Sequence, residues 1–224
     1  MKAAGVKEAE LQAQFDDAGQ QERASALGMW IFLATEVLFF GVLFVGYTVY
    51  RLAYPEAFVW GSGHLDLRLG TLNTAVLLGS SYLVALGALT ASGKGTSRRA
   101  RLFFGAAALL GCLFLAVKGM EWYHVWEEGL FPGRGSSSNS FQEGAEGGRL
   151  FFGFYYVMTG LHALHVLIGV CVLAVMAGVG GPLGWRRRIG NRTAWELAGL
   201  YWHFVDIVWL FLFPLLYLIE RSGG

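Results

Sequence analysis

Charge, proline and cysteine are all scarce in this sequence. Of its 224 residues, 15% are charged, 4 are proline and 2 are cysteine, and the formal net charge at pH 7 is +1. A chain so close to neutrality lacks the basic surface that nucleic acid requires, so we expect no nucleic-acid partner. Cys112 and Cys171 lie inside apolar runs, where a thiol behaves as a small hydrophobic group.

Several functional motifs are also missing. The sequence contains no glycine-rich phosphate loop, no nucleophile elbow and no cysteine cluster. Nothing therefore supports an independent enzyme of the soluble kind, and we predict no catalytic residue in this chain. The first 26 residues are polar and mixed in charge, without an apolar stretch beside a cleavage site, which argues against a secretory signal peptide.

Long apolar runs dominate what is present. Hydrophobic residues make up 55% of the chain, too many for an ordinary soluble protein of this length. A transmembrane helix needs about 20 consecutive apolar residues. Five runs are long enough, at about 27–50, 71–91, 102–122, 150–178 and 194–219. Strands of an outer-membrane barrel are shorter and alternate in polarity. The sequence therefore predicts an all-α, polytopic membrane protein, a bundle of five transmembrane helices.

The basic residues predict the orientation of these spans. The connections 92–101 and 179–193 each contain four lysine or arginine residues. The other two connections contain fewer basic residues, with Arg51 and Arg68 in one and Arg134 and Arg149 in the other. Because positive charge collects on the cytoplasmic side, we predict a cytoplasmic N-terminus and a C-terminus outside.

One membrane domain accounts for most of the chain. Residues 1–26 are predicted to be a polar cytoplasmic segment, either a short helix or a disordered tail, and residues 27–220 the membrane domain. The connection 125–149 is rich in glycine and serine, which is typical of a flexible, solvated loop. Small residues such as Gly111 and Gly169 recur within the spans, where they let helix backbones approach closely.

Glu36 is an acid within the first apolar run. At about 1.5 Å per residue from the cytoplasmic end near Leu27, its carboxyl group lies more than about 10 Å deep. Ionisable groups at such depth cost roughly 2.5–3.5 kcal/mol and usually serve a purpose. Glu36 is either a proton-exchanging group, or a modulator of one, or a buried acid hydrogen-bonded to a neighbouring helix. Depth alone does not separate these interpretations.

Histidines also lie within the predicted spans. His162 and His165 are three positions apart on one helix face, and Glu121 and His124 form a Glu-x-x-His pair. A dinuclear metal site in a helical bundle requires two such pairs and two further carboxylates, and only one pair is present. Haem would need two axial histidines at matched depth, and His162 and His165 share one helix. We therefore expect no metal or cofactor in this chain, and interpret the histidines as hydrogen-bonded interhelical groups.

Two further pairs are predicted from their spacing. Asp206 follows His203 by three positions, so the two side chains can pair and be buried without uncompensated charge. Lys118 either extends to the outer surface or meets Glu121, also three positions away. We predict an interhelical polar network whose members are Glu121, His162, His165, His203 and Asp206.

Three stretches are distinctive in their amino-acid sequence and in their order along the chain. Residues 28–40 read GMWIFLATEVLFF, residues 159–165 read TGLHALH and residues 202–209 read WHFVDIVW. Residues 72–78 and 118–123 add looser matches. Together, over residues 27–219, they resemble subunit III of the haem-copper terminal oxidases, the cytochrome c oxidase subunit III family, in its short five-helix bacterial form. By position, Glu36 corresponds to the buried glutamate of that family.

The resemblance implies an accessory, non-redox subunit of an aa-type cytochrome c oxidase in the bacterial inner membrane. Such a subunit docks against catalytic subunit I, with subunit II in the same complex, and stabilises the catalytic subunit. It also binds structural phospholipid and supports proton uptake during dioxygen reduction. The haem and copper would then belong to the catalytic partner. Many family members have two further N-terminal helices, so we expect half of the family's lipid cleft to come from another chain or to be absent.

Other functions remain open. The same fold could serve as subunit III of a quinol oxidase, or as the related accessory protein of nitric oxide reductase. A small proton-coupled transporter could use Glu36, His162 and Asp206 as a relay. Transporters usually show internal repeats and helices broken at mid-span, whereas this sequence shows no repeat and Pro214 is its one mid-span proline.

Overall fold

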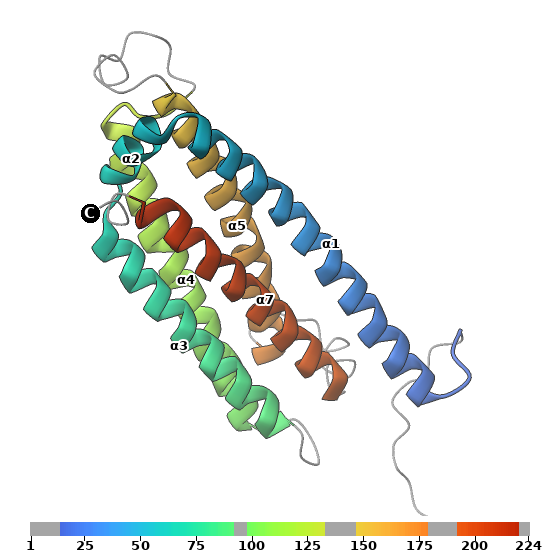
Figure 1. The fold of residues 1–224 in the computed structure, drawn as a ribbon. Coiled ribbons are helices and arrows are strands. Elements are labelled where there is room, and N and C mark those ends of the chain that lie inside the picture. The colour runs from blue at the N-terminus through green and yellow to red at the C-terminus, as the bar shows by residue number, and fades with distance from the viewer. Residues whose placement is uncertain (1–13, 92–97, 133–146, 179–191, 220–224) are drawn as a thin grey trace, which may run out of the picture.

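The chain folds as a bundle of long, roughly parallel and antiparallel helices (Figure 1). A computed structural model describes residues 14–91, 98–132, 147–178 and 192–219. Within those ranges the elements are α1 (Ala18–Ala53), α2 (Pro55–Gly63), α3 (Leu67–Ala91), α4 (Arg98–Glu127), α5 (Gly148–Ala177) and α7 (Arg192–Tyr217). All except α2 are long and apolar enough to cross a membrane, so the predicted five-span, all-α fold is confirmed.

Four of the helices form the body of the bundle. Helices α3, α4, α5 and α7 pack against one another, whereas α1 lies along α5 and α7 at one side (Figure 1). The N-terminal half of α1 diverges from the bundle (Figure 1). Its first buried side chain is Leu33, 16 positions after the N-cap residue Asp17.

The helix ends differ from the predicted span ends. Helix α1 begins at Ala18 because the Asp17 side chain accepts a hydrogen bond from the Gln20 amide at 2.7 Å and caps the first turn. Residues 18–26 are therefore continuous with the first transmembrane helix, while residues 1–13 lie outside the described part. Helix α2 was not predicted. It starts at Pro55, buries Phe58 against Phe151 of α5, and covers the end of the bundle at which α5 begins.

Close helix packing depends on a few glycines. A Cβ atom at Gly111 of α4 would lie 2.6 Å from Val170 and 2.7 Å from the Trp202 ring. A Cβ atom at Gly169 of α5 would lie 2.8 Å from the same ring. The Trp202 indole of α7 thus fills a slot that only glycine leaves open, and its Nε1 donates to Ser80 Oγ of α3 at 3.0 Å. By contrast, Gly41 and Gly79 face open space.

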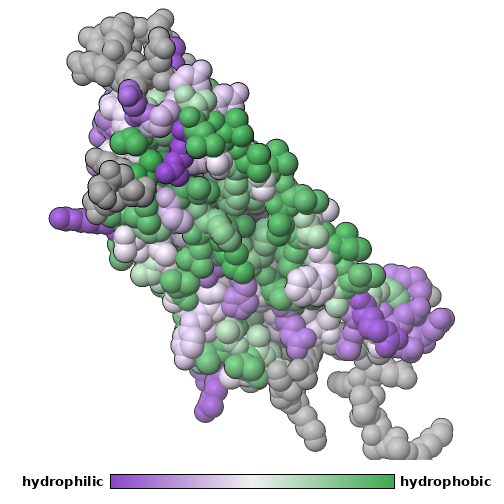
Figure 2. Space-filling view, viewed as in Figure 1, coloured by the Kyte–Doolittle hydropathy of each residue, from purple (hydrophilic) through white to green (hydrophobic). Residues whose placement is uncertain are grey.

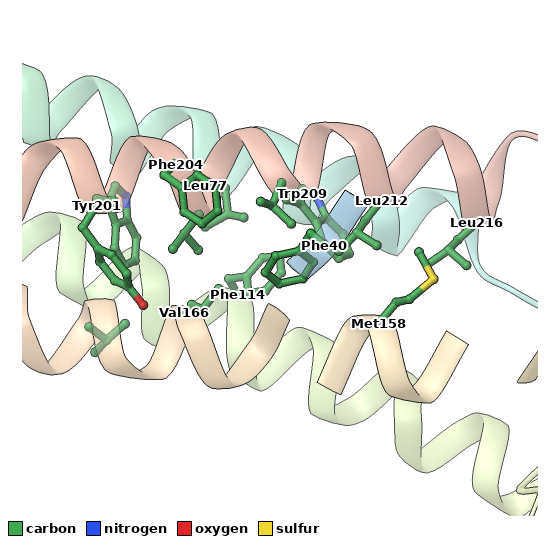
Figure 3. Packing of buried hydrophobic residues seen from close by; sticks show 14 of the residues in the cluster. Phe40, Leu77, Phe114, Met158, Val166, Tyr201, Phe204, Trp209, Leu212 and Leu216 are labelled. Atoms are coloured by element: carbon green, nitrogen blue, oxygen red, sulfur yellow. The ribbon is translucent and has the colours of Figure 1, made fainter. Parts of the chain in front are cut away.

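The core is rich in aromatic and branched side chains. Figure 3 shows Trp209 of α7 near Phe114 of α4, Phe204 of α7 beside Leu77 of α3, and Leu216 of α7 beside Met158 of α5. The Phe114 and Trp209 rings meet edge to face at 4.9 Å between centroids. Outside this core the surface is also apolar along most of the bundle's length, with hydrophilic residues gathered toward the ends (Figure 2). Leu38, Val42 and Leu52 of α1 are 70%, 72% and 78% exposed, which suits contact with lipid or another membrane chain.

Candidate functional site

Glu36 meets His165 between α1 and α5. The Glu36 Oε2 atom lies 3.1 Å from His165 Nε2, and the two side chains are 19% and 13% exposed, respectively. The Phe40 ring packs edge-on against the imidazole at 5.3 Å between centroids. Tyr201 of α7 donates its hydroxyl to the His165 backbone carbonyl at 3.1 Å. The acid predicted to be buried is thus paired with a histidine predicted to be interhelical.

The hydrogen bonds of His165 fix the position of its hydrogens. Nδ1 lies 2.7 Å from the Leu161 carbonyl oxygen, which can only accept, so Nδ1 carries a hydrogen and donates it. If Nε2 presented a bare lone pair to a Glu36 carboxylate, the two would repel. The 3.1 Å contact is therefore attractive only when a proton lies between the two atoms, carried by either group. The pair can hold a single exchangeable proton.

Lys118 and Glu121 form a second cluster, near the C-terminal end of α4. Lys118 Nζ lies 3.1 Å from Glu121 Oε1, 3.1 Å from Tyr155 Oη and 2.6 Å from Tyr217 Oη. Both tyrosine hydroxyls also donate to Glu121 Oε1. Lys118 is 1% exposed and Glu121 3%, so the alternative in which Lys118 extends to the outer surface is wrong. Three acceptors satisfy the ammonium group, and the cluster ties α4, α5 and α7 together.

His162 does not fulfil its predicted role as a hydrogen-bonded group. It is 1% exposed, and neither ring nitrogen has a hydrogen-bond partner among the described residues. Its imidazole instead stacks on the Trp209 indole at 5.3 Å and meets the Phe114 ring edge to face. The expectation failed because aromatic rings of α4 and α7, Phe114 and Trp209, pack directly against the imidazole.

His203 and Asp206 do not form the predicted direct pair. His203 Nδ1 lies 2.6 Å from Ser81 Oγ of α3, and the Ser81 side chain also hydrogen-bonds with Asp206. Ser81 projects from α3 between the two, so a hydroxyl from another helix replaces the contact that spacing alone predicted. The five members of the predicted polar network therefore occupy four separate places: the Lys118 cluster, the Glu36 pair, the aromatic slot of His162 and the α3–α7 seam.

Glu121 and His124 do not converge on a common point. Glu121 is buried against Lys118, whereas His124 is exposed. Across the described ranges, no group of three or more histidine, cysteine, aspartate or glutamate side chains is placed to hold a metal ion.

Sequence reasoning missed Ser81, Tyr155, Tyr201 and Tyr217. Tyr155 precedes His162 by seven positions, two helical turns, so it shares the buried face of α5, and this signal could have identified it. Ser81 and Tyr217 give no comparable signal, since a serine or tyrosine in a span is ordinary helix-packing or interface composition. Their partners are 122 and 96 positions away in the chain.

The comparisons with known proteins agree with these features. The family model described as "Cytochrome c oxidase subunit III" matches residues 5–220. The chain is 32% identical over 211 residues to "Cytochrome c oxidase subunit 3" of Thermostichus vulcanus, covering 92% of each chain. It is 30% identical to "Cytochrome bo(3) ubiquinol oxidase subunit 3" of Pseudomonas aeruginosa, over 87% of this chain and 85% of that one.

A longer relative carries the matching region as one part. "Heme-copper oxidase subunit I+III" of Aeropyrum pernix is 32% identical over 85% of this chain and 22% of its own length. The match to the family model spans all five membrane helices and the polar side chains between them. The chain belongs to the cytochrome c oxidase subunit III family, as an accessory subunit of a haem-copper oxidase complex.

Proposed function

We propose that the chain is a non-catalytic subunit that docks against the catalytic subunit I, with subunit II in the same complex, and supports its proton uptake from the cytoplasm. Haem and copper would be held by the partner, and dioxygen would be reduced there. The observation that carries this proposal is the Glu36–His165 pair, two ionisable groups 3.1 Å apart within the membrane-spanning part. The N-terminus would face the cytoplasm of a bacterial cell and the chain would lie in its inner membrane.

Partial exposure suits a proton-exchanging role. A group that must take up and release protons needs a route to water or to another acid. The Glu36 side chain is 19% exposed, so it is not fully enclosed by the bundle. The Lys118–Glu121 pair at the outer end is enclosed and its ammonium group is fully hydrogen-bonded. We therefore assign proton exchange to Glu36 and His165, and a structural role to the Lys118 cluster.

The long exposed face of α1 supports docking and lipid binding. Leu38 and Val42 are largely exposed, because α1 contacts the bundle along one side only. In a membrane, such a face contacts lipid tails or another subunit. The relative named subunit I+III joins the two parts in one polypeptide, which supports subunit I as the docking partner here.

The electron donor is chosen by the other subunits, so a quinol oxidase is the second candidate. The similarity to a ubiquinol oxidase subunit 3 is close to that shown by the cytochrome c oxidase relative, 30% against 32% identity. A transporter is disfavoured because the transmembrane elements are continuous helices and α7 continues past Pro214 to Tyr217.

The test is the substitution Glu36→Gln in the purified complex, isolated through a tag on this chain. Glutamine keeps the shape and removes the ionisable group, so the reduced-minus-oxidised spectrum and subunit content should match those of the wild type. Oxygen turnover should fall several-fold, or inactivation during turnover should quicken. Val37→Ala, at the neighbouring exposed position, is the control. Unchanged turnover and lifetime in Glu36→Gln would leave the pair with a hydrogen-bonding role only.

A further inference from the structure

The seam between α3 and α7 contains an unusual polar group. Ser81 contacts both His203 and Asp206 there, as described above. With Asp206 ionised, the arrangement that satisfies all three is one in which His203 Nδ1–H donates to Ser81 Oγ and the Ser81 hydroxyl donates to the Asp206 carboxylate. In that arrangement Nε2 of His203 is an acceptor. His203 is half-buried, and its Nε2 forms no hydrogen bond with any residue that the structure describes.

The seam lies deep in the membrane. His203 follows Ala194, the predicted start of its apolar run, by nine positions, or roughly 14 Å along a helix. The hydrocarbon core is about 30 Å thick, so this imidazole lies near its middle. Head groups and bulk water do not reach that depth, and an unsatisfied polar atom facing acyl chains is costly.

Apolar side chains surround the polar group on both helices. Leu78 and Tyr82 of α3 are 46% and 65% exposed, and Ile207 and Leu210 of α7 are 51% and 41% exposed. Helix α1 packs mainly on α2, α5 and α7 and leaves α3 largely uncovered. An apolar surface with a hydrogen-bonding atom near its centre is the pattern by which transmembrane helices associate.

We propose that the α3–α7 seam docks a transmembrane helix of another subunit of the same oxidase complex, which donates a hydrogen bond from a polar side chain to His203 Nε2. The proposal rests on the proposed function, because the docking helix comes from that complex. A lipid tail would fill the apolar surface but has no donor for the imidazole. A hydroxyl or indole N–H donor on the docking helix would supply the hydrogen bond that this chain does not provide.

Photocrosslinking in the intact complex tests the proposal. A benzophenone amino acid is placed at Tyr82 or Ile207, one on each side of the seam, and at Leu109 of α4, which is 71% exposed, as the control. We expect positions 82 and 207 to crosslink to the same membrane subunit, and position 109 to give a different product. Crosslinking of 82 and 207 to lipid alone would overturn the proposal. If no oxidase subunit co-purifies with the chain, the proposed function itself fails.

A pair of substitutions tests the hydrogen bond. His203→Phe removes the acceptor, and His203→Gln keeps one in its amide oxygen. Interhelical hydrogen bonds in membranes are modest, so the fraction of the chain retained by the complex in detergent should fall roughly three- to twentyfold in the phenylalanine variant. The glutamine variant should be retained close to the wild-type level. Equal retention of both variants would contradict a role for His203 Nε2.

Discussion

At the scale of single residues, the Lys118–Glu121 pair shows how this bundle accommodates two buried charges. Both are almost fully buried, and their side chains lie 3.1 Å apart. Two tyrosines from other helices hydrogen-bond to both Lys118 Nζ and Glu121 Oε1, so the two opposite charges share a single cluster. Glu121 Oε2 is buried and has no hydrogen-bond partner among the described residues. A buried pair of this kind is sensitive to the loss of one partner and much less so to the loss of both.

We predict that Lys118→Met destabilises the chain by about 3–5 kcal/mol, because Glu121 then lacks its counter-charge. The double variant Lys118→Met/Glu121→Leu should recover most of that stability. Unfolding in mixed detergent micelles, followed by circular dichroism, measures both. Met120→Leu, at an exposed position of the same helix, is the control. A single variant as stable as the wild type would show that the pair contributes little.

Spacing along one helix predicted some of these contacts and missed others. Lys118 and Glu121 meet as their three-residue separation suggests. His203 and Asp206 have the same separation, yet Ser81 of another helix interacts with both. Local spacing fixes which side chains share a face. It does not determine what the opposite helix brings to that face, so the tyrosine and serine partners could not be predicted.

At the scale of helices, the glycines of α4 show where neighbouring helices pack closely against it. Helices gain little from hydrophobic burial against one another in lipid, so dispersion contact over short distances matters most. At Gly111 the Trp202 ring of α7 and Val170 of α5 come within 2.7 Å of where a Cβ atom would lie. Gly119, two turns later in α4, has nothing within 4 Å.

We therefore predict opposite effects for two alanine substitutions in α4. Gly111→Ala forces Trp202 or Val170 to move and should destabilise the chain by about 1–3 kcal/mol. Gly119→Ala meets no neighbour and should stabilise it by up to about 1 kcal/mol through helix propensity. The same detergent unfolding assay measures both. Equal effects at the two positions would mean that the Trp202 slot relaxes without cost.

Helix existence was easier to predict than helix ends. All five apolar runs became transmembrane helices because the length and hydropathy of each run are sufficient. Helix α1 extends to Ala18 because the polar residues before the span continue the helix up to a capping aspartate, which hydropathy does not detect. Helix α2 is nine residues long and lies between spans, so no membrane pattern marked it.

At the scale of the whole molecule, the N-terminal segment is separable from the bundle. No side chain described before Leu33 is buried, so residues 14–24 add nothing to the core. We predict that removal of residues 1–24 leaves insertion, topology and thermal stability of the chain unchanged. Protease accessibility in inverted vesicles and a thermal melt check this. Loss of insertion in the truncated chain would contradict the five-span topology.

The described residues contain an odd number of membrane helices, and this has a practical consequence for any fusion protein. Helix α1 starts at one end of the bundle and α7 finishes at the other (Figure 1). A reporter enzyme attached ahead of α1 and one attached behind α7 would therefore sit in different compartments and should give opposite signals in the same cell. Likewise, a membrane partner joined ahead of α1 by a short linker must itself finish on the side where α1 starts.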